Sequence, residues 1–162
     1  MKPIHLLLAA DDHFAWLLDK APAPAGLRQP EGGFDQEAVI SLLRRVTATL
    51  HAAGCFASWL MVDQDQLVGS CCFVRPPDPA GVAEIGYGVA ASCRRRGYAT
   101  SAVGLLVDEV AQTRAASRLE AGTAIHNLGS QRVLERNGFT RAGARHDPDD
   151  GELILWTREV PG

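Results

Sequence analysis

Apolar residues recur along the chain at two different spacings, which predict helices in some segments and strands in others. From Phe34 to His51 they follow the i, i+3, i+4, i+7 spacing of a helix packed on one side. From Tyr98 to Arg114 the same spacing predicts a second long helix. The core-facing residues expected in these helices are Val39, Leu42, Leu43, Val46 and Leu50, and then Ala99, Ala102, Val103, Leu106 and Val110. Shorter helices are expected at Asp11–Lys20, capped by Asp11 or Asp12, and at Leu128–Arg136.

Short apolar runs bounded by turn residues predict strands. Two of them, Phe56–Val62 and Gln66–Val74, are separated by Asp63-Gln64-Asp65 and are expected to form a hairpin. Pro76 to Gly81 is expected to be a turn, because proline cannot join a central ladder. The other strands are expected at Ile4–Ala9, Ala83–Val89, Leu119–Thr123, Phe139–Arg145 and Glu152–Thr157. The resulting order, β-α-α-β-β-β-α-β-α-β-β, predicts the α/β (α+β) class, with a mixed sheet covered by helices.

Composition narrows the class of protein further. With 162 residues, 46% of them hydrophobic, the chain is expected to form a single domain over residues 1–162. A net charge of −3 gives no broad attraction for nucleic acid, and no stretch approaches the roughly 18 apolar residues that span a membrane. The four cysteines lack metal-ligand spacing, so we expect reduced thiols, no metal and a cytoplasmic protein. Among them, Cys93 precedes three arginines, which would lower the pKa of its thiol and make it the most reactive of the four; the alternative, which we favour, is an ordinary loop residue.

The segment Arg94-Arg95-Arg96-Gly97-Tyr98-Ala99-Thr100 joins an expected strand to an expected helix. Basic side chains, a glycine that lets backbone approach a ligand and a helix N-terminus with unpaired N–H groups together predict a phosphate site. The spacing matches neither the Walker loop nor the three-glycine dinucleotide fingerprint.

Three segments resemble motifs of one family. Arg94-x-x-Gly97-x-Ala99 resembles the pyrophosphate loop of the GNAT superfamily, the acetyl-CoA-dependent N-acetyltransferases. Residues 127–139, from Asn127 to Gly138-Phe139, resemble the family's later motif of Asn, Ser, a short helix and Gly-Phe. Residues 84–89 resemble the strand before the loop, particularly in the branch that includes ribosomal-protein N-terminal acetyltransferases.

The resemblance implies a fold, a cofactor and a reaction. The sheet would be mostly antiparallel, with about seven strands and about four helices, splayed between the fourth and fifth strands. The reaction would be direct transfer from acetyl-CoA to a primary amine of a small molecule or a peptide N-terminus, by a monomer or homodimer without a metal. The residues expected to bind the cofactor are Val89, Arg94, Arg95, Arg96, Gly97, Tyr98, Ala99, Thr100, Asn127 and Ser130.

The reaction requires proton transfers, for which the sequence offers two candidate catalytic residues. An alkyl ammonium has a pKa near 10.4 and a thiol near 8.5, so a base matters more than an acid. Glu84 is the candidate base, with a plain polar strand residue as the alternative, and Ser130 is the hydroxyl candidate near the departing sulfur, with helix capping as the alternative. Tyr87 alternates away from Glu84 in a regular strand. Many relatives have a tyrosine where this chain has Leu134, which leaves a catalytically silent acyl-CoA-binding regulatory module as the alternative function.

The acceptor is indicated only by charge. The expected loop between the last two strands contains Asp147, Asp149 and Asp150. Their local potential favours a cationic amine, whereas the alternative is a solvated turn without a role in binding.

Overall fold

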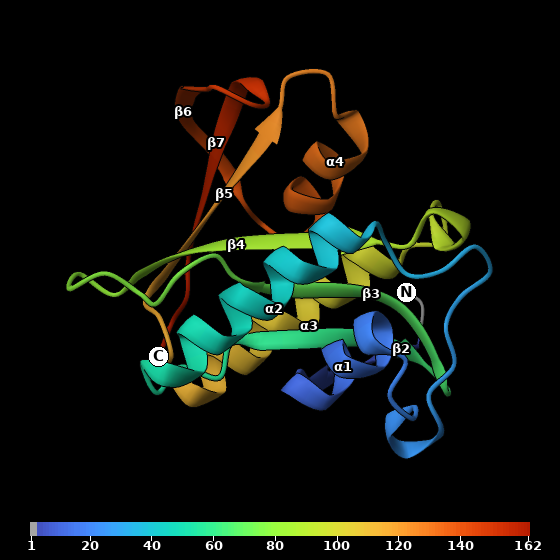
Figure 1. Cartoon of the computed structure of the whole chain (residues 1–162). Coiled ribbons are helices and arrows are strands. Elements are labelled where there is room, and N and C mark those ends of the chain that lie inside the picture. The colour runs from blue at the N-terminus through green and yellow to red at the C-terminus, as the bar shows by residue number, and fades with distance from the viewer. Residues whose placement is uncertain (1–2) are drawn as a thin grey trace.

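In the computed structural model, which describes residues 3–162, one sheet of seven strands runs through the molecule (Figure 1). The strand order is β1-β2-β3-β4-β5-β7-β6, and every neighbouring pair is antiparallel except β4 and β5. The strands are β1 (His5–Leu8), β2 (Ser58–Asp63), β3 (Gln66–Phe73), β4 (Val82–Val89), β5 (Arg118–Ala124), β6 (Thr140–Asp147) and β7 (Gly151–Glu159). The helices are α1 (Asp11–Asp19), α2 (Glu37–Ala52), α3 (Tyr98–Thr113) and α4 (Leu128–Arg136), with 3-10 turns at Pro24–Gly26 and Ala91–Cys93. The predicted fold class and element order are confirmed.

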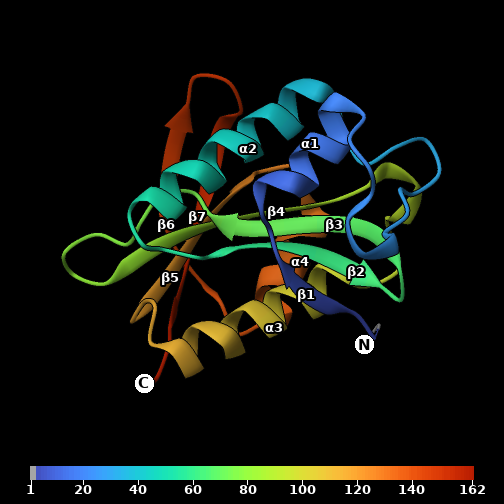
Figure 2. The ribbon, with the colours of Figure 1, turned by 60° about the horizontal axis from the view of Figure 1, so that its bottom comes forward.

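The helices cover the sheet from both sides. In Figure 2, α1 and α2 lie over one face of the β1 to β4 half and α3 lies over the other. The apolar stripe predicted for α3 is confirmed at four of its five positions, because Ala102, Val103, Leu106 and Val110 are buried, whereas Ala99 is half-buried. Since each face of the half-sheet is covered, strands β2 and β3 bury nearly all their side chains.

The stripe predicted for α2 is partly wrong. Val39 is 37% exposed and Leu42 is 51% exposed, whereas Ile40, Thr47 and Leu50 are buried. Helical spacing alone leaves the exact orientation of a helix open, and the buried line Ile40, Thr47 and Leu50 is the one that faces the sheet. Thr47 meets a strand residue there, since its hydroxyl lies 2.8 Å from the Ser58 hydroxyl.

The N-terminal ends of α4 and α1 are capped in different ways. Asn127 caps α4, because its Oδ1 accepts from the Ser130 N–H at 3.1 Å. The cap predicted at Asp11 or Asp12 is wrong: Ala10 is the N-cap of α1 and its N–H donates to His13 Nδ1. The Asp11 carboxylate instead pairs with Arg44 of α2 at 2.7 Å, which ties the two helices together.

The central strands part in the middle of the sheet. β4 and β5 pair only from Val82 to Glu84 and from Arg118 to Glu120, and the strands then diverge (Figure 1). Beyond Glu84, no strand of residues 3–162 pairs with this edge of β4. The splay implied by the family resemblance is confirmed, and it opens a cleft that α4 borders.

Candidate active site

The basic turn before α3 presents unpaired backbone donors. Arg95 (φ 63°) and Gly97 (φ 82°) are in the left-handed region, which turns the chain sharply into the helix. Ser101 makes the first helical bond, to the Gly97 carbonyl, so within residues 3–162 the N–H groups of Ala99 and Thr100 have no acceptor and Gly97 supplies no side-chain cap. A helix N-terminus in this state favours an anion.

A hollow of about 660 Å³ lies against this turn, and we call it the arginine-lined pocket. Its lining is Tyr87, Gly88, Val89, Cys93, Arg94, Arg95, Gly97, Tyr98, Ala99, Thr100, Asn127, Gly129, Ser130, Arg132, Val133 and Arg136. It therefore includes four arginines and no carboxylate. Arg96 is the one predicted cofactor residue outside this lining. The sequence reasoning missed Arg132 and Arg136, although their i, i+4 spacing on α4 places them on one helix face.

Two hydrogen bonds hold the basic turn in place. Arg94 Nε donates to the Val89 carbonyl at 3.2 Å, so this arginine also closes the turn onto the end of β4. The Tyr98 hydroxyl donates to Asp63 Oδ2 at 2.6 Å, and this hydrogen bond is the main reason why the pKa of Tyr98 is raised. Cys93 is only 2% exposed, so its thiol is not the accessible group that the neighbouring arginines would activate.

A second hollow, of about 420 Å³, lies at the splay, and we call it the carboxylate-lined pocket. Its lining is Val74, Glu84, Ile85, Gly86, Tyr87, Ala121, Gly122, Thr123, Ala124, Asn127, Ser130, Arg145, Asp147, Asp150 and Leu153. Glu84 is the last residue of β4 that pairs with β5, and its side chain is 17% exposed. Both of its oxygens are paired, Oε1 with Arg145 and Oε2 with Arg75, each at 3.2 Å. An incoming ammonium group would therefore compete with guanidinium groups for this carboxylate.

The three aspartates of the β6–β7 turn differ in their positions. Asp147 and Asp150 line the carboxylate-lined pocket, whereas Asp149 does not. Asp147 Oδ1 accepts from the backbone N–H groups of Asp149 (2.8 Å) and Asp150 (3.0 Å). These hydrogen bonds, that from Asp150 foremost, hold the pKa of Asp147 below its usual value. The Asp147 carboxylate thus stabilises the turn. Asp150 also lines the pocket, and its carboxylate is not part of these turn hydrogen bonds.

Tyr87, Asn127 and Ser130 line both pockets and mark where they meet. The Tyr87 hydroxyl lies 2.7 Å from Ser130 Oγ and also donates to the Ser130 carbonyl at 3.2 Å. The strand is regular here, since the β3–β4 register runs without a bulge. Tyr87 and Glu84 nevertheless line the same pocket, because β4 has lost its β5 neighbour and both of its faces open onto the gap. Leu134, by contrast, is fully buried in the core and lines neither pocket.

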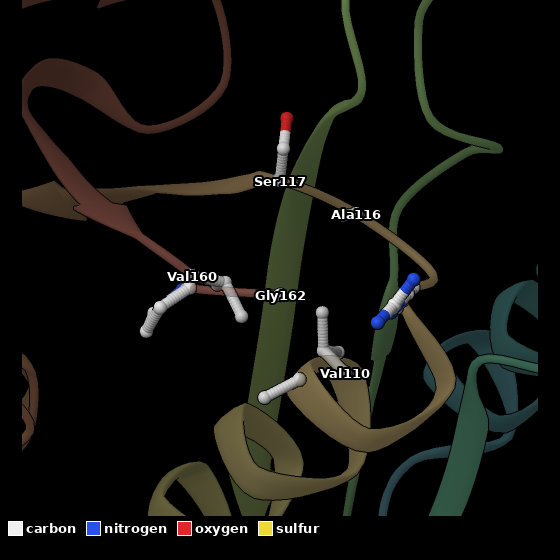
Figure 3. Close-up of a pocket in the computed structure, with 8 residues that line it drawn as sticks. Val110, Ala116, Ser117, Val160 and Gly162 are labelled. Carbon is white, nitrogen blue, oxygen red and sulfur yellow. The ribbon is translucent and has the colours of Figure 1, made fainter.

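A further hollow, of about 350 Å³, lies at the opposite end of α3 (Figure 3). Val110, Ala116 and Val160 contribute to an apolar lining in which Arg114 is the single charged side chain. A helix of this length separates it from the basic turn by about 24 Å. Within residues 3–162 no group of His, Cys, Asp and Glu side chains is arranged to hold a metal ion, and no helix is long and apolar enough to cross a membrane.

Comparison with known proteins places this geometry in a family. Residues 6–140 match the acetyltransferase (GNAT) domain family. The uncharacterized N-acetyltransferase YjdG of Bacillus subtilis (strain 168) is 34% identical over 102 residues, which cover 62% of this chain and 61% of YjdG. The probable N-acetyltransferase YjcK of the same organism is 43% identical over 61 residues, 38% of this chain and 34% of YjcK. The matched region thus spans less than two thirds of either relative.

Solved structures share the fold at low sequence identity. RimL, a ribosomal alpha-N-protein acetyltransferase in complex with coenzyme A, superimposes with a TM-score of 0.73 at 20% identity, covering 97% of this chain and 94% of RimL. The microcin C7 self-immunity acetyltransferase MccE, in complex with acetyl-CoA and AMP, superimposes with a TM-score of 0.71 at 16% identity, covering 97% of this chain and 92% of MccE. The aminoglycoside acetyltransferase AAC(6')-Ib, in complex with coenzyme A, superimposes with a TM-score of 0.67 at 18% identity, covering 97% of this chain and 95% of that enzyme.

The splayed sheet, the basic turn at the start of α3 and the family match over residues 6–140 agree with one another. This chain belongs to the GNAT acetyltransferase family.

Proposed function

We propose that the protein transfers the acetyl group of acetyl-CoA directly to a primary amine, on a small cationic molecule or a peptide N-terminus. The observation that supports this most is the meeting of two oppositely charged pockets at Tyr87, Asn127 and Ser130. One pocket suits a polyanionic donor and the other a cationic acceptor, and direct transfer requires both to reach the same point.

The arginine-lined pocket suits coenzyme A by charge and by backbone geometry. Coenzyme A has a diphosphate and a 3′-phosphate, and the pocket offers Arg94, Arg95, Arg132 and Arg136 with no opposing carboxylate. The N–H groups of Ala99 and Thr100, which lack an acceptor in the part of the chain that the structure describes, suit the diphosphate. Val89, at the end of β4, is proposed to contact the pantetheine arm where the arm enters the splay.

The carboxylate-lined pocket suits an amine that arrives protonated. Glu84 is proposed to take the ammonium proton, directly or through water, before the amine attacks the thioester carbon. Ser130 is proposed to give its hydroxyl proton to the sulfur as the C–S bond breaks. Asp150 adds negative potential at the pocket, which favours a cationic acceptor.

Catalysis by Glu84 is tested with Glu84→Gln and the matched control Glu120→Gln. Glu120 pairs directly with Glu84 in the sheet but lines neither pocket. A panel of amines and peptides is incubated with acetyl-CoA, and free thiol release gives the rate. We expect Glu84→Gln to lower kcat by about 10²-fold or more with unchanged affinity for coenzyme A, and Glu120→Gln to match the wild type. Equal kcat for both variants would remove Glu84 from the mechanism.

The charge preference of the acceptor is tested at the β6–β7 turn. Asp150→Asn should raise KM for a cationic amine, whereas Asp149→Asn should leave KM unchanged because Asp149 lies outside the pocket. Both variants keep the backbone N–H groups that bind Asp147, so the turn stays intact. Equal KM values for the two variants would show that this turn does not select the acceptor. Tight coenzyme A binding without thiol release across the whole panel would instead favour a regulatory cofactor-binding module.

A further inference from the structure

Two hydroxyl groups from different parts of the chain meet where the pockets join. Tyr87 comes from the half of β4 that pairs with β3 but not with β5, and Ser130 comes from the first turn of α4. Their oxygens lie 2.7 Å apart, the distance of a good O–H···O hydrogen bond. Both residues line the arginine-lined pocket and the carboxylate-lined pocket, so the pair extends from the acceptor side to the donor side.

The chemistry of acyl transfer leaves one proton that Glu84 does not account for. A primary ammonium loses its first proton before attack, but the nitrogen still has an N–H proton to lose once the C–N bond has formed. The departing sulfur needs a proton at the same stage, because a thiolate is a poorer leaving group than a thiol. A path from nitrogen to sulfur satisfies both needs without creating a free ion.

We infer that Tyr87 and Ser130 form a proton relay between the acceptor amine and the sulfur of the cofactor, which makes Tyr87 a catalytic residue. As the C–N bond forms and the C–S bond breaks, the amine N–H proton passes to Tyr87 Oη. The Tyr87 O–H proton passes to Ser130 Oγ, and the Ser130 O–H proton passes to sulfur. The products are an amide and a free thiol, and both hydroxyl groups end as neutral as they began. This inference rests on the proposed function, since it assigns the second proton of the same reaction.

The surroundings of the pair suit this role. Burial raises the pKa of Tyr87, against a smaller opposing effect of the Ser130 hydrogen bond, so the phenol is neutral at physiological pH and can both donate and accept. The Ser130 carbonyl, 3.2 Å from the phenol oxygen, offers an acceptor for the phenolic O–H between turnovers. Ser130 is itself held by the Asn127 cap at its N–H. Leu134 has an aliphatic side chain and lies in the core, so it cannot replace either hydroxyl group.

The relay predicts that the two hydroxyl groups act as one unit. Tyr87→Phe and Ser130→Ala should each lower kcat by about 10²-fold with KM for acetyl-CoA within about twofold of the wild type. The double variant should be no slower than the slower single variant, because either change already interrupts the path. Ser117→Ala, which removes an exposed hydroxyl outside both pockets, should keep the wild-type kcat.

The experiment measures thiol release with the acceptor that the wild type uses fastest, together with the melting temperature and coenzyme A affinity of every variant. Losses in kcat that multiply in the double variant would overturn the relay, as would an unchanged kcat in Tyr87→Phe. A loss in Tyr87→Phe that is matched by weaker coenzyme A binding or a lower melting temperature would assign Tyr87 to packing instead. In these cases wild-type turnover persists and the proposed function stands. Absence of turnover in the wild type would overturn the proposed function and the relay together.

Discussion

A methyl group added at Gly69 is expected to destabilise the fold, because β3 and β4 approach closely at this residue. Gly69 pairs with Val89 across the two strands. A Cβ atom built at Gly69 would lie 2.5 Å from the Gly88 carbonyl oxygen, 2.7 Å from Met61 Sδ and 3.2 Å from Val89 Cα. The methionine side chain can rotate away, but the carbonyl is part of the β4 backbone. The variant Gly69→Ala therefore forces β4 to move.

The expected size of the effect follows from two opposing terms. Overpacking of a core position costs about 1–3 kcal/mol, and a backbone clash at 2.5 Å belongs in the upper part of that range. Alanine recovers about 0.5–1 kcal/mol over glycine in a strand through the smaller entropy of its unfolded chain. The net loss for Gly69→Ala is then about 1–2 kcal/mol in the free energy of unfolding. For a domain of this size that corresponds to a fall of about 2–8 °C in melting temperature.

Gly88→Ala is the matched control. Gly88 directly precedes Val89, the residue that pairs with Gly69, but a Cβ atom built at Gly88 meets nothing within 4 Å. We expect its free energy of unfolding to equal that of the wild type or to exceed it by up to about 1 kcal/mol. Urea denaturation followed by fluorescence of the three tryptophans measures both variants. Equal stabilities for Gly69→Ala and Gly88→Ala would refute the argument that this backbone contact limits the side chain at position 69.

The remaining predictions concern charge and capping. Arg136→Glu should weaken coenzyme A binding by about tenfold or more, measured by titration calorimetry. The control Arg45→Glu, at an exposed position of α2, should leave the affinity unchanged. Equal losses of affinity in the two variants would mean that only the overall charge matters. Arg44→Met should lower the stability at pH 7. Its difference from the wild type should vanish as the pH falls through the folded-state pKa of Asp11, which the hydrogen bond from Arg44 holds below its usual value; a difference that persists at pH 2 would contradict this ion pair as the cause. Asn127→Ala should cost about 1 kcal/mol through loss of the α4 cap, measured by urea denaturation, and an unchanged midpoint would argue against the cap.

Local sequence patterns were enough to predict the helices, the strands and the basic turn. Residue periodicity, proline and glycine positions and turn chemistry act over a few neighbours, so the order of strands and helices was predictable. The basic turn was predictable for the same reason, because Arg94 to Thr100 are contiguous and their backbone geometry is local. The exposed Val39 and Leu42 show the limit of this reasoning, since a periodic stripe leaves the exact orientation of a helix open.

The residues that meet across the splay come from distant parts of the chain, so local patterns could not predict their contacts. The Tyr87 hydroxyl contacts Ser130, 43 positions away, and Arg145 pairs with Glu84, 61 positions away. Strand alternation predicted that Tyr87 and Glu84 would be separated by the sheet, yet the divergence of β4 from β5 opens both of their faces to one cleft. That divergence depends on how the two halves of the sheet pack, which is a property of the whole fold and of no local segment.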